Sequence, residues 1–524
     1  MSKRSLKLVL GGALLVVVAL GLAFVSRQRP KARLRAYKAS LVAQGEKLTI
    51  DELASRPSVE AQQATRALLQ AAQQFRVGVV LPHNLPGSMK AILPGRARVG
   101  WKQPDLRLPG ETNTWEQLAA DLDADRETLR QIREILKSPA VGFDLDYRQG
   151  FRLLVSHRAP ILKTAQRLSA VTLYELHEGR LEDAAANLEA LLALIEVLRD
   201  EPLLMSQIGR EVMARTAFAT TWDALQADGW TDAQLALIQE RWEALEFLAP
   251  MKRAMDMERA IGLDTFNQAR GSAVLRRQLL DRSSLPWPWP ALPDEVGDVP
   301  ELGKRVASSL PLWIREQRWL WADFYTDELK FLQAFDLMQP VKLNVQVGGP
   351  FALPYRQMTT DLGEFDLQVT RSTRYLLTEM LTPGLARAFW RSGELEMQHE
   401  LAVAAIALKR HHLRHGAWAP SLVALVPEFL SRVPRDFMDG GELRYRVNAN
   451  GTWILYSVGE NGVDDGGNPQ PSSEKSQTKF FGYGLDAVWP QPATPEEVAR
   501  EEEASQRVGM DAQMMKRYGL VPAK

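Results

Sequence analysis

Oxygen-bearing side chains gather in one short, glycine-rich stretch near the C-terminal end of the sequence. Its polar members are Glu460, Asn461, Asp464, Asp465 and Asn468, and its glycines are Gly459, Gly462, Gly466 and Gly467. Calcium takes about six to eight oxygen ligands from carboxylates, amides and backbone carbonyls, and glycines let a short loop turn its carbonyls inward. The spacing differs from that of an EF-hand loop. The stretch therefore predicts either a calcium site, with Asp464 and Asp465 as the essential ligands, or a flexible acidic turn that binds nothing.

Two other pairs of residues have spacings that could serve chemistry. His411 and His415 lie one helical turn apart, a spacing that lets two imidazoles share a metal ion. No carboxylate accompanies them at ligand spacing, and they belong to a basic run that repels cations, so the end of a solvated helix is the favoured interpretation. Asp121 and Asp125 are four residues apart and are predicted to lie on a solvated helix face.

No catalytic motif is complete. The segment Gly297 to Lys304 resembles a phosphate-binding loop, but it has one intervening residue too many, and Arg305 stands where serine or threonine is needed. The nucleophile-elbow, zinc-protease and dinucleotide motifs are absent. Cysteine is absent too, which excludes disulfides, thiolate metal sites and a cysteine nucleophile. We therefore predict no catalytic residue and no cofactor other than calcium.

The elements that position the acidic stretch form an ordered series. An apolar helix is expected through Leu401 to Leu408, followed by a basic run and by Gly416 as its stop. Pro420 then opens a short second helix. Strands are expected at 443–447 and 452–458, joined by an Asn-Gly turn that accepts positive φ angles.

This order resembles the C-terminal half of the major (G-type) pseudopilins of type II secretion. The matching residues are Gly416, Trp418, Pro420, Leu422, Ala424 to Val426, Pro434, Asp436, Asp439, Gly440, Tyr445, Ser457, Gly459, Asn461 and Gly462. The resemblance covers roughly an eighth of the chain, the share expected of one small module. It implies an α+β module, calcium in the matching loop, and a link to secretion or pilus-like assembly. An unrelated module built from a helix and a hairpin is the alternative.

The N-terminal sequence departs from the pseudopilin pattern. It lacks the acidic residue of the pilin processing site, because no acidic residue precedes Glu46. Instead, Leu8 to Val25 is an uncharged apolar run of about the minimum length for a membrane-spanning helix. A cleaved signal peptide is the competing interpretation, but five cations follow at 27–35 without a clear cleavage site. We expect an uncleaved, single-pass anchor and no polymerisation as a pilin subunit.

The orientation of the anchor rests on two opposing signals. The cations that follow the apolar run indicate that the bulk of the protein, which follows the anchor, lies in the cytoplasm. The pseudopilin-like module argues for an extracytoplasmic bulk, and a short N-terminus beginning with Lys and Arg is also a common export signal. We expect a cell-membrane protein whose bulk is extracytoplasmic.

The remainder of the 524 residues predicts a mainly α protein with more than one domain. Equal numbers of basic and acidic residues, 64 of each, give no basic field for nucleic acid. Helices are expected at 49–75 with a break at Pro57, and at 112–137, 161–178, 181–199, 203–225, 231–273 with a kink at Pro250, 311–338 and 364–391. The segment 82–110 is expected to be a long loop. Tyr174, Gly179 and Ala184 resemble one tetratricopeptide unit, but no second unit follows at the expected period, which favours a generic helical hairpin.

These patterns predict a membrane anchor with basic flanks (1–35), a multi-helix body (36–392), the pseudopilin-like α+β module (393–488) and a charged tail (489–524). The expected function is that of a membrane-tethered, non-enzymatic envelope protein that acts through protein–protein contacts. The alternative is an envelope hydrolase whose site is assembled from residues distant in sequence. A deep pocket with converging ionisable side chains would favour the hydrolase.

Overall fold

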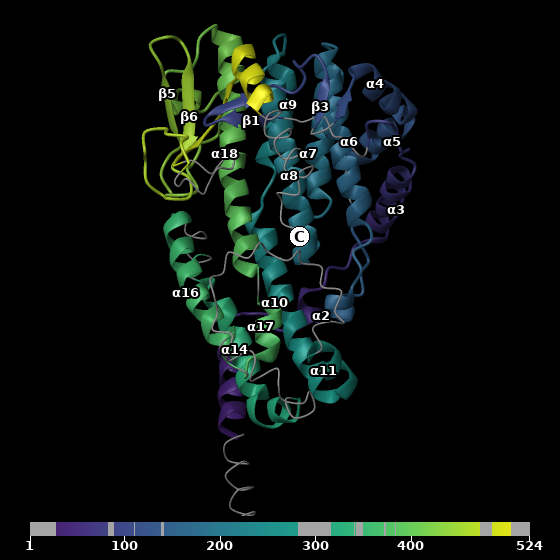
Figure 1. The fold of residues 1–524 in the computed structure, drawn as a ribbon, viewed down its shortest axis with the longest axis vertical. Coiled ribbons are helices and arrows are strands. Elements are labelled where there is room, and N and C mark those ends of the chain that lie inside the picture. Colours follow the sequence, from purple (N-terminus) through teal and green to yellow (C-terminus); the bar gives the residue numbers. More distant parts are fainter. Residues whose placement is uncertain are drawn as a thin grey trace, which may run out of the picture.

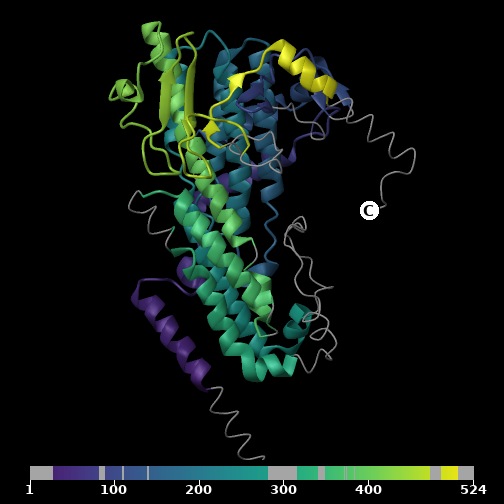
Figure 2. The same ribbon diagram turned by 60° about the vertical axis from the view of Figure 1, so that its left-hand side comes forward.

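The computed structural model of the chain is mainly helical and elongated (Figures 1 and 2). It describes residues 28–81, 89–108, 111–137, 141–280, 316–339, 341, 349–370, 372, 374–382, 384–471 and 485–504. The apolar run Leu8 to Val25, the proline-rich segment 283–300 and the loop at 297–304 lie outside these residues. Within them, no helix is both long enough and apolar enough to cross a membrane.

Stacked helical pairs form the upper part of the molecule in Figure 1. Their helices are α3 (Val59–Gln73), α4 (Trp115–Ala124), α5 (Arg126–Leu136), α6 (Arg158–His177), α7 (Leu181–Glu196), α8 (Leu204–Leu225) and α9 (Asp232–Glu243). Helix α6 packs on α3, α7 and α8, while α7 packs on α5 and α9. Each pair therefore covers the apolar face of the next, as in α-helical repeat proteins. The hairpin predicted around Gly179 is confirmed, with that glycine at φ 73°.

The lower part of the molecule consists of longer helices and short connecting pieces. These are a helix over 28–43, α2 (Ile50–Leu53), α10 (Leu248–Gly271), α11 (Ala273–Leu280), α14 (Phe324–Asp336), α16 (Ala352–Thr370) and α17 (Leu376–Leu381). The aromatic residues Trp319, Phe324, Phe331 and Phe335 are buried, whereas Trp321 is 63% exposed.

Helix α18 (Leu385–His415) connects the two parts. It packs on α8, α9 and α10, and it ends at Gly416, which has the predicted left-handed conformation (φ 71°). Residues 392 and 393, where we expect the body to meet the module, both lie inside this helix. Buried side chains from Leu34 to Trp489 belong to one hydrophobic cluster. The division into body and module remains a prediction.

The α+β part near the C-terminus contains the predicted hairpin. Strands β5 (Arg444–Val447) and β6 (Trp453–Ser457) pair antiparallel, and β7 (Ala487–Val488) extends the sheet on the other side of β6. A 3-10 turn (Leu422–Leu425) replaces the short helix expected after Pro420.

The expectation of a long loop at 82–110 is wrong for its described residues. Strands β1 (Lys90–Leu93) and β2 (Arg96–Arg98) form a sheet with β8 (Gln491–Pro492), and β3 (Leu106–Leu108) pairs with β4 (Glu111–Asn113). Strand β8 comes from the far end of the chain, so the local sequence around 90–98 carries no signal of that pairing.

Three expected helices also differ from the structure. The one expected at 364–391 is divided among α16, α17 and α18. The helix expected at 112–137 is divided at Asp125 into α4 and α5. The helix expected at 231–273 is interrupted at 244–247, before Pro250, and Pro250 then occupies the first turn of α10. A proline is tolerated there because the amides of a first turn have no partner inside the helix.

Candidate functional site

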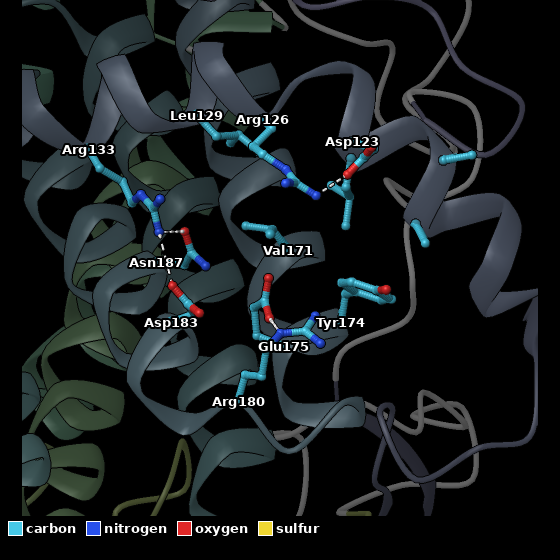
Figure 3. Close-up of a pocket in the computed structure, with 13 residues that line it drawn as sticks. Asp123, Arg126, Leu129, Arg133, Val171, Tyr174, Glu175, Arg180, Asp183 and Asn187 are labelled. Atoms are coloured by element: carbon cyan, nitrogen blue, oxygen red, sulfur yellow. Dashed lines mark hydrogen bonds and ion pairs between the residues drawn. The ribbon is translucent and has the colours of Figure 1, made fainter.

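A groove of about 660 Å³ lies between the α4–α5 pair and the α6–α7 hairpin (Figure 3). Its lining residues are Ala119, Ala120, Leu122, Asp123, Arg126, Leu129, Arg133, Val171, Tyr174, Glu175, Arg180, Asp183 and Asn187. Helix packing accounts for its position, since α5 contacts α7 and α4 contacts α6 on either side of it. The groove is therefore a property of the stack rather than of one loop.

The floor of the groove is apolar and its rim is charged. Leu122, Leu129 and Val171 are buried beneath it. Asp123 and Arg126 stand on the rim and pair with each other, with side chains 65% and 80% exposed. Tyr174 stands on the α6 wall and presents a half-buried ring. A surface of this kind suits the mixed apolar and polar face of another protein segment.

Three arginines line the groove, and each one has acidic or amide partners. Arg133 donates from Nη1 to Oδ1 of Asn187 at 3.2 Å and lies 3.9 Å from Asp183. Arg180 pairs with Glu175 across the mouth of the hairpin. Partial burial would lower the pKa of Arg180, but its hydrogen bonds and charge contacts with Glu175 raise it above its usual value.

These ion pairs indicate a binding surface more than a reaction centre. Catalysis by acids and bases needs ionisable groups that converge on one reacting atom with pKa values matched to the task. Here Asp123, Glu175 and Asp183 each face a different arginine in Figure 3. A second cleft of about 320 Å³ shares Arg133 and reaches Arg241 of α9, so the concave surface continues along the stack.

Sequence reasoning found only one residue of this groove. Tyr174 was identified through its similarity to a helical-repeat position. The other lining residues come from α6 and its turn and from α4, α5 and α7, and no short motif relates them. The signal available in the sequence was the hairpin pattern itself, since stacked hairpins create grooves between neighbouring pairs.

Asp121 and Asp125 do not lie on a solvated face, contrary to the sequence-based expectation. Both are buried. Asp121 accepts hydrogen bonds from the backbone N–H groups of residues 79–81, at 2.7 to 2.9 Å. Asp125 forms a buried ion pair with Arg167 and accepts the N–H of Arg76 at 3.0 Å. The two carboxylates hold the segment after α3 in place, a long-range role that their spacing could not reveal.

The acidic loop at 459–468 is held by contacts within itself and with strands β5 and β6. Asp464 accepts the Tyr456 hydroxyl at 3.0 Å and lies 3.4 Å from Arg444. Asp465 accepts Nδ2 of Asn461 at 2.7 Å. A hydrogen bond from the Gly466 amide, together with the Tyr456 and Arg444 contacts, lowers the pKa of Asp464.

A buried carboxylate outside the predicted ligand set organises the same loop. Asp486 accepts the backbone N–H groups of Gly467 at 2.7 Å and Asn468 at 2.9 Å. The side-chain oxygen of Asn468 accepts the backbone N–H of Gln470 at 3.1 Å, and Glu460 is exposed. The loop brings Asn461 to Asp465, but the described residues contain no group of three or more acidic, histidine or cysteine side chains arranged to hold a metal ion. Calcium binding remains a prediction.

The rings of His411 and His415 lie with their centroids 4.4 Å apart at the end of α18, tilted by 40° to each other. His411 hydrogen-bonds the carbonyl of Ala417 through Nδ1 at 3.0 Å, and Nε2 of His415 lies 3.7 Å from Glu428. Both rings also contact Phe429. The pair belongs to the charged end of the helix, as the sequence predicts.

Buried carboxylates with raised pKa values are the remaining chemical candidates. Burial raises the pKa of Glu211 to about 7, of Asp223 to about 7 and of Asp327 to about 6. Such shifts often mark catalytic groups. None of the three lines the groove, the 320 Å³ cleft or a third cleft of about 510 Å³ near Tyr147. Asp223 and Asp327 instead accept backbone N–H groups from distant segments.

Comparison with known proteins gives no relative for this chain: no family model, curated protein or solved structure matches it.

Proposed function

We propose that this chain is a membrane-tethered, non-enzymatic envelope protein that binds a partner protein in the groove between α4–α5 and α6–α7. The observation that carries the proposal is the groove's construction, an apolar floor under a rim of mutually paired charges. The exposed pair of Asp123 and Arg126 contributes little stability, so a partner's charged residues can replace it at low cost. The pseudopilin-like order of the C-terminal elements supports a role in secretion or pilus-like assembly.

The arrangement of the molecule supports the same proposal. The helix over 28–43, which follows the apolar run in sequence, lies at one end of the long axis, whereas α4, α5 and the β5–β6 hairpin lie toward the other (Figures 1 and 2). An anchor at Leu8 to Val25 would thus hold the groove away from the bilayer. No specific observation favours the hydrolase, so we do not propose it.

Photocrosslinking of the full chain in its native membranes tests the contact surface. A photoreactive residue at Ala120, an exposed position in the groove, should yield one adduct of discrete mass. The double substitution Arg126→Glu with Tyr174→Ala should abolish that adduct, and a probe at the exposed Thr360 of α16 serves as the control. No adduct from Ala120, or the same adduct from Thr360, would contradict the proposal.

Membrane association and orientation are tested separately. The full chain should stay with membranes through an alkaline wash, and deletion of residues 1–28 should release it. Recovery of the full chain in the soluble fraction would contradict the anchor. Protease added to spheroplasts should cut the body, and protection of the body would contradict the extracytoplasmic orientation.

A further inference from the structure

The helix over 28–43 is docked on the protein along one face only. Leu34 and Leu41, seven residues apart, are buried in the main hydrophobic cluster. Between them, Lys38 pairs with Glu328 of α14, a carboxylate whose side chain is 3% exposed. Because these three positions recur at helical spacing, they fix the rotation of the helix on the body.

The leading half of the same helix carries four exposed cations. Arg29 and Arg33 lie four residues apart on one flank of the docked face, and Lys31 and Arg35 lie four apart on the other. No acidic side chain in the described part of the chain pairs with any of the four. They differ in this from exposed arginines elsewhere, such as Arg130 and Arg148, which pair with Glu127 and Asp51.

Chain length limits how far the first of these cations lies from the apolar run Leu8 to Val25. Arg29 is four residues beyond Val25, and a chain spans at most about 3.5 Å per residue, so the two lie within about 14 Å of each other. A charge this close to a bilayer surface lies within about two screening lengths of it. Figures 1 and 2 both place the leading end of this helix at one end of the molecule.

We propose that the helix over 28–43 binds the headgroups of anionic phospholipids through Arg29, Lys31, Arg33 and Arg35. The inference rests on the proposed anchor, which brings the helix to the bilayer. Four clustered cations, in a chain with no net charge, attract an anionic surface, and the attraction weakens with salt. Docking through Leu34 and Lys38 then transmits the helix's orientation to the body, so lipid binding fixes the tilt of the whole molecule.

The experiment uses the full chain, which contains no cysteine and therefore takes a single label at any introduced one. An environment-sensitive dye is attached at Ala32→Cys, among the cations, or at Ala186→Cys on α7, both exposed sites. The protein is reconstituted in phosphatidylcholine vesicles with or without about one third phosphatidylglycerol. Acrylamide, a neutral quencher, reports how accessible each dye is to water.

Phosphatidylglycerol should reduce acrylamide quenching of the dye at Ala32→Cys by roughly 3- to 10-fold and leave quenching at Ala186→Cys unchanged. The reduction should vanish at high salt and in the variant R29Q/K31Q/R33Q/R35Q. Equal quenching in both vesicles, or an effect that survives in the variant, would overturn the proposal. An alkaline wash of the same samples separates the two hypotheses: a chain that resists the wash but ignores phosphatidylglycerol refutes only the lipid site. A chain that is washed off refutes the anchor, and its dye response to added vesicles still decides the lipid site.

Discussion

At the residue scale, the least expected feature is a set of carboxylates buried between helices. Glu211 of α8 lies against α18, where it accepts the Ser392 hydroxyl at 2.9 Å through Oε1, while Oε2 has no hydrogen-bond partner. Burial is the main cause of its raised pKa, about 7, and Glu394 adds to the effect. The folded protein therefore favours the neutral acid near and below pH 7.

The pH dependence of Glu211 has a definite sign. Its pKa is higher in the folded than in the unfolded chain, so it stabilises the fold at low pH, and that contribution is lost as pH rises through about 7. We expect Glu211→Gln to raise the free energy of unfolding at pH 8, by at most about 3 kcal/mol, and to change it little near pH 4.5. Denaturant unfolding across this range measures the effect, with the exposed Glu182→Gln as control. Parallel pH profiles for Glu211→Gln and the natural chain would refute the assignment.

The acidic loop gives a second prediction at this scale. Calcium bound there would compete with Arg444 for Asp464 and with Asn461 for Asp465. Calorimetry on the full chain should then show binding and a higher melting temperature with calcium. Asp464→Ala combined with Asp465→Ala should remove both effects, whereas the exposed Asp228→Ala should keep them. Absence of heat and of any melting shift in the natural chain would show that the loop functions without metal.

At the scale of elements, close helix packing depends on single glycines. A Cβ atom at Gly262 of α10 would clash with the ring of Phe331 on α14. Gly363 of α16 is also helical, but a Cβ there would meet open space. Gly262 therefore permits α10 and α14 to pack closely, whereas Gly363 only weakens its own helix.

Alanine substitutions at the two glycines should change stability in opposite directions. Gly262→Ala should lower the free energy of unfolding by about 1–3 kcal/mol through overpacking. Gly363→Ala should raise it by up to about 1 kcal/mol, because alanine is the better helix former. Thermal unfolding of both variants measures this, and Phe331→Leu should partly rescue Gly262→Ala. If Gly262→Ala were as stable as the natural chain, α10 and α14 would have to pack less closely than the structure shows.

Elements with strong local signals were predictable from the sequence, and those that depend on distant partners were not. The hairpin around Gly451, the stop at Gly416 and the α6–α7 turn at Gly179 each follow from a few neighbouring residues. Strand β2 did not, because its partner β8 lies almost 400 residues away. The groove was missed for the same reason, since its floor and rim come from four helices.

At the scale of the whole molecule, the C-terminal segment closes the fold onto its first half. Trp489 is buried against Phe218 of α8, with ring centroids 5.4 Å apart, and the Trp222 indole donates to the carbonyl of Pro490 at 2.9 Å. Strand β8 then pairs with β2. Together with the unbroken α18, these contacts join the helical stack and the β5–β6 sheet through one hydrophobic cluster.

Such a shared core predicts cooperative unfolding of the described body, hairpin included. Trp489→Ala removes a large buried side chain, so it should lower the free energy of unfolding by about 3–5 kcal/mol. Because the cluster is continuous, we expect the whole calorimetric transition to shift to lower temperature as one peak, with equal calorimetric and van't Hoff enthalpies. Trp321→Ala, at an exposed tryptophan, is the matched control and should shift the peak little. Two resolved transitions, of which Trp489→Ala moved only one, would instead establish that the C-terminal α+β part is a separate domain and that α18 merely passes between two independent folding units.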